Sequence, residues 1–217
     1  MRKVIAYILM SLSLCQPLMA QADDIVIAVL GDSLTQGYGL PAEDGLVPQL
    51  QRWLDAQRAD VVLLNAGVSG DTTAGGLSRV DWTLTPDVDA MIVALGGNDL
   101  LRGLAPEDAR TNIDGILSAA NSKQVEVLLI GMQAPGNFGA DYKARFDAVY
   151  PELATKHNVL LMQNFFAGLL ESAQATDPAS LQRWFQADGI HPNAEGVANI
   201  VTRIGPEVLA LIDTIKE

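Results

Sequence analysis

The sequence predicts an α/β fold in which helices cover both faces of a parallel β-sheet. Short runs of Val, Ile, Leu and Ala alternate with longer stretches whose apolar residues recur at helical spacing. The short runs are apolar throughout, which is typical of strands buried on both faces. Polar loops that contain glycine follow three of them, as at the strand ends of βαβ units. Right-handed crossovers then make the sheet parallel.

Five strands are expected, of which the last is the shortest. They comprise residues 25–30, 61–65, 90–95, 125–130 and 159–162. Because the carboxyl ends of parallel strands meet at one edge of the sheet, the loops that follow them are expected to form one crevice.

The expected helices turn their apolar residues toward the sheet. They comprise a helix that ends near residue 58, one that opens near Leu77, one from Pro106, one over 141–156, a short one over 167–173 and one from Ala194. Gly205-Pro206 is expected to kink or break the last helix. The chain shows no repeats or linker-like stretches, so residues 23–217 are expected to form one domain.

Residues 1–22 have the three parts of a removable export signal. Arg2 and Lys3 precede an apolar run that is too short to span a membrane, and small residues follow it. Cleavage is expected after Ala20 or Ala22, which would place the mature protein in the periplasm or outside the cell.

Charge and composition exclude several partners. The formal net charge is −12, and loss of the two cationic residues of the signal makes it −14. Nucleic acids call for clustered Lys and Arg, so no nucleic-acid partner is expected. Beyond the signal no apolar run is long enough to span a bilayer, so no stable membrane anchor is expected. The only cysteine, Cys15, leaves with the signal, so no disulfide is expected.

Ser33 is the candidate nucleophile. It lies in Gly31-Asp32-Ser33, directly after the first strand, which places its hydroxyl at the ligand-binding edge of the sheet. Taken alone, such a turn also fits a simpler reading, in which Asp32 or Ser33 caps a helix.

A serine hydroxyl needs a base, and the chain has two histidines. His191 lies in a loop, three residues after Asp188, from where a carboxylate can reach the imidazole and fix its tautomer. The alternative is an ordinary polar loop that leads into a helix. His157 lies at the C-terminus of a helix and is expected to be an exposed side chain that the helix dipole favours.

Attack on a carbonyl also needs donors for the oxyanion. The candidates are the N–H groups of Ser33 and Gly70 and the carboxamide of Asn98. Gly70 could equally be a left-handed turn residue and Asn98 an Asx turn, and neither role excludes catalysis. Asp32 and Asp99 without a companion histidine cluster give little support to a metal site.

Other motifs of hydrolases and nucleotide-binding proteins are absent from the sequence. It contains no Gly-x-Ser-x-Gly elbow, no Walker A loop and no Gly-x-Gly-x-x-Gly fingerprint. It does contain four ordered blocks, namely Gly31-Asp32-Ser33-Leu34, Ser69-Gly70-Asp71-Thr72, Gly96-Gly97-Asn98-Asp99 and Asp188-Gly189-Ile190-His191. Together they resemble the GDSL, or SGNH, hydrolase family, and most closely its bacterial periplasmic branch of acyl-CoA thioesterase I, lysophospholipase L1 and arylesterase.

The resemblance covers nearly the whole mature chain and implies a flavodoxin-like, three-layer α/β/α fold with strand order 2-1-3-4-5. It implies a triad of Ser33, Asp188 and His191, and an oxyanion hole formed by Ser33, Gly70 and Asn98. One departure is Thr35, where the first block of the family usually has Ser.

The expected function is hydrolysis of carboxylic esters or thioesters through an acyl-enzyme, without a cofactor. The resemblance favours acyl thioesters, aryl esters or lysophospholipids as small-molecule or lipid substrates. Leu100, Leu101 and Leu104 are expected to form one wall of a shallow apolar cleft. Two alternatives stay open: a carbohydrate O-deacetylase, which would show aromatic platforms near the cleft, and a non-catalytic binding protein, which would lack one of the blocks. The sequence does not indicate an oligomeric state.

Overall fold

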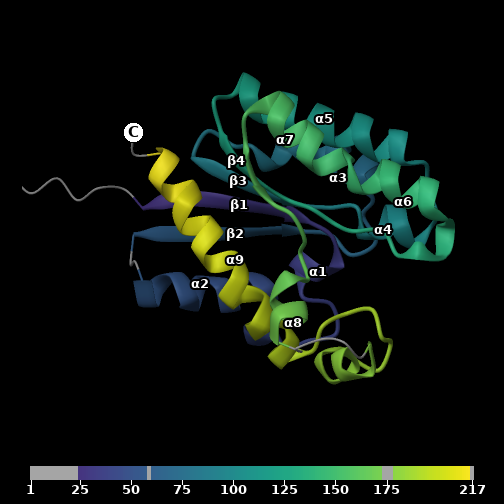
Figure 1. Ribbon diagram of the computed structural model, residues 1–217. Helices are drawn as coiled ribbons and strands as arrows, with labels where there is room; N and C mark the ends of the chain where they lie inside the picture. Colours follow the sequence, from purple (N-terminus) through teal and green to yellow (C-terminus); the bar gives the residue numbers. More distant parts are fainter. Residues whose placement is uncertain (1–23, 58–59, 173–177, 216–217) are drawn as a thin grey trace, which may run out of the picture.

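The structure is a computed structural model that describes residues 24–57, 60–172 and 178–215. The export signal predicted for residues 1–22 lies outside the described residues. In the described part, one sheet of parallel strands has the order β2-β1-β3-β4-β5 (Figure 1). Its strands are β1 (Ile25–Gly31), β2 (Val61–Gly67), β3 (Ala90–Ala94), β4 (Glu126–Ile130) and β5 (Leu160–Met162). The predicted α/β class and strand order are confirmed.

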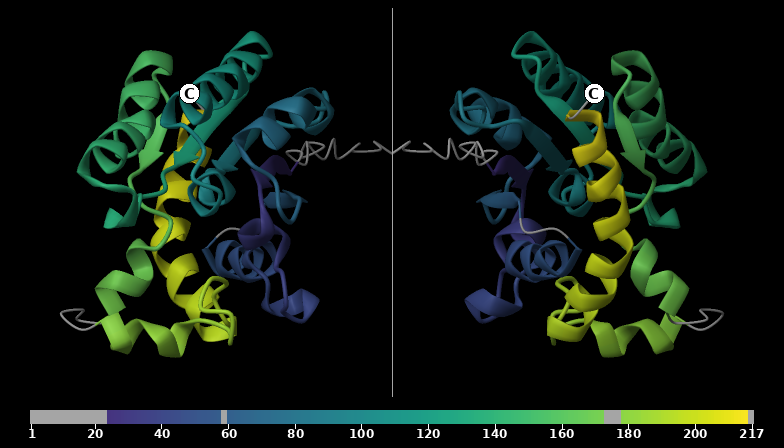
Figure 2. Two further views of the ribbon diagram at one scale, coloured as in Figure 1. Left: turned by 90° about the vertical axis from the view of Figure 1, so that its right-hand side faces the viewer. Right: turned by 90° about the vertical axis from the view of Figure 1, so that its left-hand side faces the viewer.

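Helices cover both faces of this sheet. The α-helices are α1 (Ser33–Gln36), α2 (Leu46–Gln57), α3 (Thr73–Thr83), α4 (Gly97–Leu101), α5 (Pro106–Ser122), α6 (Ala140–Asp147), α7 (Val149–His157), α8 (Ala167–Ser172) and α9 (Ala194–Ile215). The 3₁₀ helices are η1 (Ala42–Asp44), η2 (Gly136–Phe138) and η3 (Pro178–Trp184). Helices α2, α8 and α9 lie on one face, and α3, α5, α6 and α7 lie on the other (Figures 1 and 2). No helix in the described part is long and apolar enough to cross a membrane.

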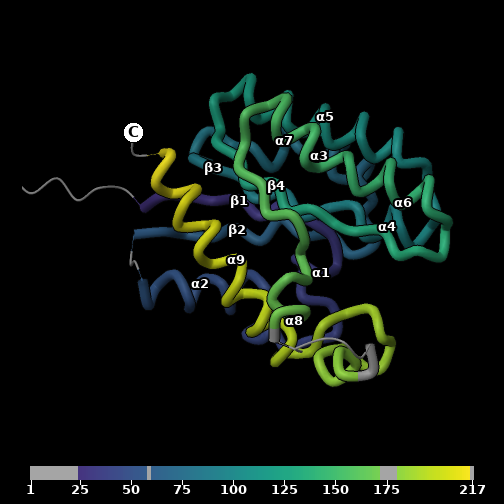
Figure 3. Tube along the Cα trace, in the orientation of Figure 1, coloured from purple at the N-terminus to yellow at the C-terminus, as the bar shows by residue number. Residues whose placement is uncertain are grey.

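The central strand β3 is buried along its whole length because helices cover it from both sides. The edge strand β2 differs, since Val62 and Leu64 are exposed on one of its faces. Beyond the carboxyl ends of the strands, η3 and the loop before α9 lie beside the loop after α1 (Figure 3). All the loops that carry the four sequence blocks therefore lie at this edge.

Helix α3 begins earlier than its apolar pattern predicts. The pattern predicts a start near Leu77, but the helix begins at Thr73, with Thr72 as the N-cap that accepts a hydrogen bond from the N–H of Gly75. Gly75 and Gly76 are poor helix formers, which conceals the start in the sequence. A Cβ at Gly76 would overlap the side chain of Leu95, so the glycine lets α3 pack closely on the sheet.

A short helix, α4, follows β3 where the sequence suggests a loop. Its N-cap is Gly96, with φ of +116°. The Tyr150 hydroxyl donates to the carbonyl of Leu95 and occupies the space that a Cβ on Gly96 would need. Only glycine adopts this positive φ without strain and also leaves room for the Tyr150 hydroxyl. Asn98 consequently lies in the first turn of a helix rather than directly at the strand end.

Two further boundaries differ from the expected ones. The single helix expected over 141–156 is divided at Ala148, because Pro151 cannot donate to the carbonyl of Asp147 and its ring crowds that group. Conversely, α9 runs unbroken through Gly205 and Pro206. A Cβ at Gly205 would lie 2.5 Å from the Trp53 ring, so α9 packs tightly on α2. That packing offsets the hydrogen bond that Pro206 forfeits.

Candidate active site

Ser33 lies at the sharp turn between β1 and α1. The strand ends at Gly31, where a Cβ would overlap the Thr35 side chain, so only glycine allows the chain to turn here. Asp32 caps α1, with its Oδ1 accepting from the N–H of Leu34 at 3.0 Å. The helix-capping interpretation of this turn is therefore correct for Asp32, and it leaves the Ser33 hydroxyl available to another partner.

That partner is His191. Its Nε2 lies 2.8 Å from Ser33 Oγ, and its Nδ1 lies 2.7 Å from Asp188 Oδ2. Asp188 Oδ1 also accepts the N–H groups of Ile190 and His191, which fixes the carboxylate within its own loop. The imidazole of His191, followed by these two N–H groups, lowers the pKa of Asp188 to about 2, so the carboxylate is ionised at neutral pH.

Two residues that the sequence patterns do not single out hold the His191 loop. The ring of Tyr38 lies 4.6 Å from the imidazole ring, centroid to centroid. Gln186 donates from its side chain to the carbonyls of Tyr38 and Pro192, while its N–H donates to the carbonyl of His191. The loop after α1 and the loop before α9 are thereby joined around the base.

Asn98 faces the nucleophile turn from α4. Its Nδ2 donates to Asp32 Oδ2 at 3.3 Å. Because an ionised carboxylate only accepts hydrogen bonds, this contact turns the NH₂ end of the carboxamide toward Asp32, the residue before Ser33. Asp32 itself is 1% exposed, and this burial raises its pKa to about 6, against the lowering effect of Leu34 N–H and Asn98.

Gly70 lies in the turn that follows β2. The N–H of Asp71 donates to the carbonyl of Val68, which closes the turn. Gly70 has φ of +87°, so it is the left-handed turn residue that the sequence suggested as one of its roles. Its carbonyl accepts a hydrogen bond from Arg102 Nη2 at 2.7 Å. Gly70 is outside the lining of the cleft described next.

A cleft of about 360 Å³ opens beside Ser33 and His191. Of the leucines expected to form its wall, Leu100 and Leu101 line it and Leu104 does not. The rest of its apolar wall consists of residues that the sequence reasoning missed, namely Leu34, Met132, Pro135, Phe138, Phe166, Phe185 and Ile190. Leu34 lies in α1 and Phe138 ends η2, while the others lie between helices and strands, so only the tertiary fold brings them together.

Phe138 and Ile190 are partly exposed at this cleft, as is Leu101. Gln133 and Asn137 are the uncharged amides in its lining besides Asn98. The arrangement therefore combines a wide apolar surface with a few polar groups around one hydroxyl. This is the composition of a site for a small apolar ligand.

Asp99 has a structural role rather than that of a metal ligand. Its buried carboxylate accepts the N–H of Thr73 at 2.9 Å and the Thr73 hydroxyl at 2.6 Å, which joins α4 to the start of α3. Among the residues that the structure describes, no group of three His, Cys, Asp or Glu side chains could hold a metal ion.

The expectation that His157 is exposed is wrong. Its side chain is only 7% exposed, with Nε2 lying 2.6 Å from Asp114 Oδ1 and Nδ1 lying 3.1 Å from Asn121 Nδ2. The cluster lies where α7 ends before β5, which is the edge of the sheet opposite Ser33. The side chain can be largely buried because α5 supplies polar partners there.

Comparison with known proteins places the chain in a family. Residues 29–198 match the GDSL-like Lipase/Acylhydrolase family. The chain is 34% identical to Esterase TesA of Pseudomonas aeruginosa, over 88% of this chain and 92% of that protein. It is 32% identical to the Escherichia coli K12 protein named thioesterase 1/protease 1/lysophospholipase L1, over 89% and 87%. Among solved structures, the SGNH-hydrolase family esterase AlinE4 superposes with a TM-score of 0.69 at 41% identity, covering 88% and 98%.

Proposed function

The chain belongs to the GDSL-like Lipase/Acylhydrolase family, and we propose that it is a serine esterase whose nucleophile, base and orienting acid are Ser33, His191 and Asp188. The observation that carries the proposal is the unbroken series of contacts from Asp188 through His191 to the Ser33 hydroxyl. An imidazole held between a carboxylate and a hydroxyl is the arrangement that activates a serine for attack on an acyl carbon.

In the first half of the reaction, His191 Nε2 takes the Ser33 proton as Oγ attacks the carbonyl carbon of the ester. Asp188 keeps the proton of the imidazole on Nδ1 and stabilises the imidazolium. The N–H groups of Ser33 and Gly70 and the carboxamide of Asn98 stabilise the oxyanion. The imidazolium then protonates the leaving alcohol or thiol, and an acyl-Ser33 remains.

In the second half, His191 takes a proton from water, which attacks the acyl carbon. The tetrahedral intermediate collapses, the carboxylic acid leaves, and the proton on His191 returns to Ser33 Oγ. Nothing in this sequence of steps calls for a cofactor, since His191 passes the Ser33 proton to the leaving group and later passes a proton of water back to Ser33.

The cleft composition favours an acyl chain as the part of the substrate that binds there. Acyl thioesters, aryl esters and lysophospholipids all present such a group. The phenylalanines Phe138, Phe166 and Phe185 would also suit a carbohydrate O-deacetylase. A sugar, however, needs many hydrogen-bonding partners, and the lining offers few polar side chains outside the catalytic groups, so the acyl reading is the stronger one.

We place the mature protein in the periplasm or outside the cell, on the basis of the three-part signal in residues 1–22. N-terminal sequencing of the protein from its native host is expected to begin at Gln21 or Asp23. A product that retains Met1 would contradict this placement.

The catalytic proposal is tested with a panel of p-nitrophenyl esters, acyl-CoA thioesters and lysophosphatidylcholine. Wild type is compared with Ser33→Ala, which is expected to lose activity on every substrate. A sulfonyl fluoride or organophosphorus reagent is expected to label Ser33 alone, as read by peptide mapping. An adduct on Ser69, or full activity in Ser33→Ala, would overturn the assignment.

A further inference from the structure

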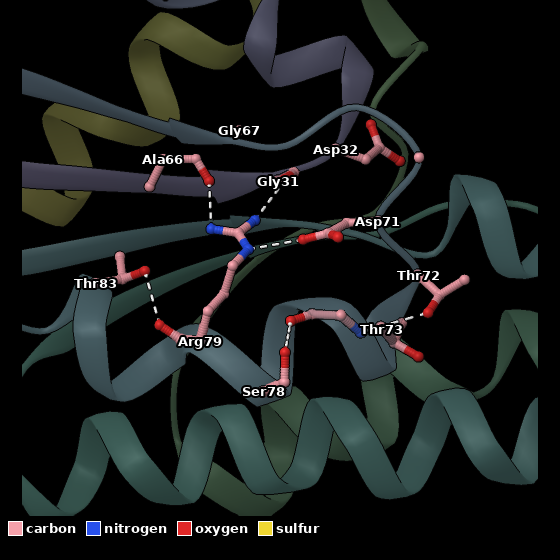
Figure 4. Close-up of polar contacts among 12 residues, drawn as sticks. Gly31, Asp32, Ala66, Gly67, Asp71, Thr72, Thr73, Ser78, Arg79 and Thr83 are labelled. Atoms are coloured by element: carbon pink, nitrogen blue, oxygen red, sulfur yellow. Dashed lines mark hydrogen bonds and ion pairs between the residues drawn. The ribbon is translucent and has the colours of Figure 1, made fainter.

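The side chain of Arg79 joins three segments at the catalytic edge of the sheet. From α3, its Nη2 donates to the carbonyl of Gly31 at 2.9 Å and its Nη1 donates to the carbonyl of Ala66 at 2.7 Å. Its Nε donates to Asp71 Oδ2 at 2.7 Å. Figure 4 shows the guanidinium facing all three acceptors from below the ends of the strands. The sequence patterns give no indication of this role.

Two of these acceptors lie close in sequence to groups of the proposed reaction. Gly31 lies two residues before Ser33, and Asp71 directly follows Gly70. Ser33 and Gly70 supply two of the oxyanion donors, but they lie on different segments of the chain. The carbonyl of Gly31 also accepts the N–H of Val68 at 3.0 Å, so this one oxygen connects the turn that carries Gly70 to the end of β1.

Its burial and its three hydrogen bonds show that Arg79 holds these segments in place and is not an ordinary surface charge. The side chains of Arg79 and Asp71 are 22% and 18% exposed, so both are largely removed from solvent. A planar guanidinium with donors in a fixed fork can bind three acceptors at fixed directions, whereas a lysine ammonium cannot reach all three. Arg102, the C-cap residue of α4, also binds the turn of Gly70, through the carbonyl of that residue.

We propose that Arg79 is a positioning residue, which holds the N–H groups of Ser33 and Gly70 at the separation that the oxyanion requires. The inference rests on the proposed function. Without these three hydrogen bonds, the turn of Gly70 is held, among the described residues, to β1 only by the Val68 N–H and to α4 only by Arg102, so it can shift relative to β1 while the cleft keeps its lining. Misplaced donors weaken transition-state binding more than substrate binding, so the loss falls on kcat.

The test compares Arg79→Ala and Arg79→Lys with a control, Arg110→Ala, which removes another arginine–carboxylate pair. Arg110 pairs with Glu152 at 2.7 Å, but on the surface, with 36% and 60% exposure. For Arg79→Ala we expect kcat for a p-nitrophenyl ester to fall roughly 10–100-fold with KM changed less than about twofold. Arg79→Lys is expected to recover little of this loss, and Arg110→Ala is expected to keep full activity.

Two readouts separate positioning from general stability. Complete labelling by the organophosphorus reagent counts folded sites, and kcat is expressed per labelled site at a temperature far below the melting temperature. Added guanidinium ion, at concentrations that leave the wild type unchanged, is expected to raise kcat of Arg79→Ala but not of Arg110→Ala. A purely structural role would lower the melting temperature and leave kcat per labelled site unchanged.

If Arg79→Ala does not fold, Asp71→Asn decides the question. It keeps the shape of the side chain but removes the charge that orients the guanidinium, and a several-fold loss of kcat at constant KM is expected. Wild-type kcat per labelled site in Asp71→Asn, or in a folded Arg79→Ala, overturns the inference, as does a loss confined to KM. Such results would leave the proposed function standing if Ser33→Ala is inactive. Activity in Ser33→Ala would instead refute the proposed function itself.

Discussion

Asp32 combines a structural and a chemical role that conflict with each other. Its carboxylate caps α1 and orients Asn98, yet it is buried close to Asp99 and next to Ser33, one of the proposed oxyanion donors. Burial is the main reason that its pKa rises to about 6, while the hydrogen bonds from the Leu34 N–H and the Asn98 side chain oppose that rise. Ionisation of Asp32 therefore destabilises the folded protein. The ionised carboxylate, however, only accepts hydrogen bonds, whereas the protonated carboxyl group could also donate one to the site.

We predict that the free energy of unfolding of Asp32→Asn exceeds that of the wild type by an amount that grows as the pH rises. Between pH 4 and 6 folded Asp32 retains a proton that the unfolded chain has lost, so wild-type stability falls through this window. The raised pKa corresponds to roughly 3 kcal/mol in the free energy of unfolding. Urea denaturation at pH 4, 5, 6 and 7 measures the difference between the two proteins. A difference that stays constant with pH would show that Asp32 keeps its ordinary pKa.

Asn98→Ala tests the oxyanion hole through a single side chain. Removal of one donor is expected to lower kcat by about 10²–10³ and to change KM little, because the donor acts mainly on the transition state. Asn121→Ala, which removes a carboxamide at the opposite edge of the sheet, serves as the control. Equal kcat values for Asn98→Ala and wild type would exclude Asn98 from the oxyanion hole.

The candidate triad could be identified from the sequence because its members lie in short local motifs. Asp188 and His191 are three residues apart, and Ser33 follows a strand end directly. Arg79 and Tyr38 could not be found in this way. Each acts through contacts with segments distant in sequence, and neither position has a local pattern that distinguishes it from an ordinary surface residue.

At the scale of elements, strands were predictable and several helix ends were not. A run such as Ala90–Ala94 is apolar throughout and admits few other interpretations. The start of α3 depends instead on a hydrogen bond from Gly75 to Thr72 and on contacts with Asp99. Tertiary contacts of this kind override weak local propensity, so apolar spacing does not predict the start of a helix that has two glycines in its first turn.

The contact between α7 and α5 gives the third prediction. His157→Ala removes the ring that bonds Asp114 and Asn121, and leaves these polar groups without that partner. The free energy of unfolding is expected to fall by about 1–2 kcal/mol, with kcat unchanged, since the cluster lies at the far edge of the sheet. Lys156→Ala, which removes a well-exposed partner of Asp114, is expected to cost less than about 1 kcal/mol. Loss of turnover in His157→Ala together with full turnover in His191→Ala would reverse the assignment of the base.

For the whole molecule, the parallel sheet follows from the alternation of apolar runs with amphipathic stretches, because crossovers have one favoured hand. The division into a signal over 1–22 and one domain over 23–217 remains a prediction, since residues 1–23 lie outside the described part. The cleft was only partly predictable. Two of its three expected leucines line it, but its phenylalanines lie outside the α-helices and the strands of the sheet.

The net charge of the molecule leads to the last prediction, which concerns the choice of leaving group. The chain carries −12, and none of the described residues that line the cleft is Lys or Arg. An acyl-CoA substrate brings several phosphate charges of the same sign, whereas a p-nitrophenyl ester with the same acyl chain is neutral. Long-range repulsion should therefore slow encounter with the thioester alone.

The dependence of kcat/KM on salt concentration distinguishes this repulsion from a difference in how well the two substrates fit the cleft. The Debye length falls from about 30 Å at 0.01 M to about 8 Å at 0.15 M ionic strength. Over this range kcat/KM for the acyl-CoA is expected to rise several-fold, while kcat/KM for the p-nitrophenyl ester of the same chain length stays level. A kcat/KM for acyl-CoA that falls with salt would mean that a local cation attracts the phosphates. The exposed Arg102, beside Gly70, would be the first residue to replace in that case.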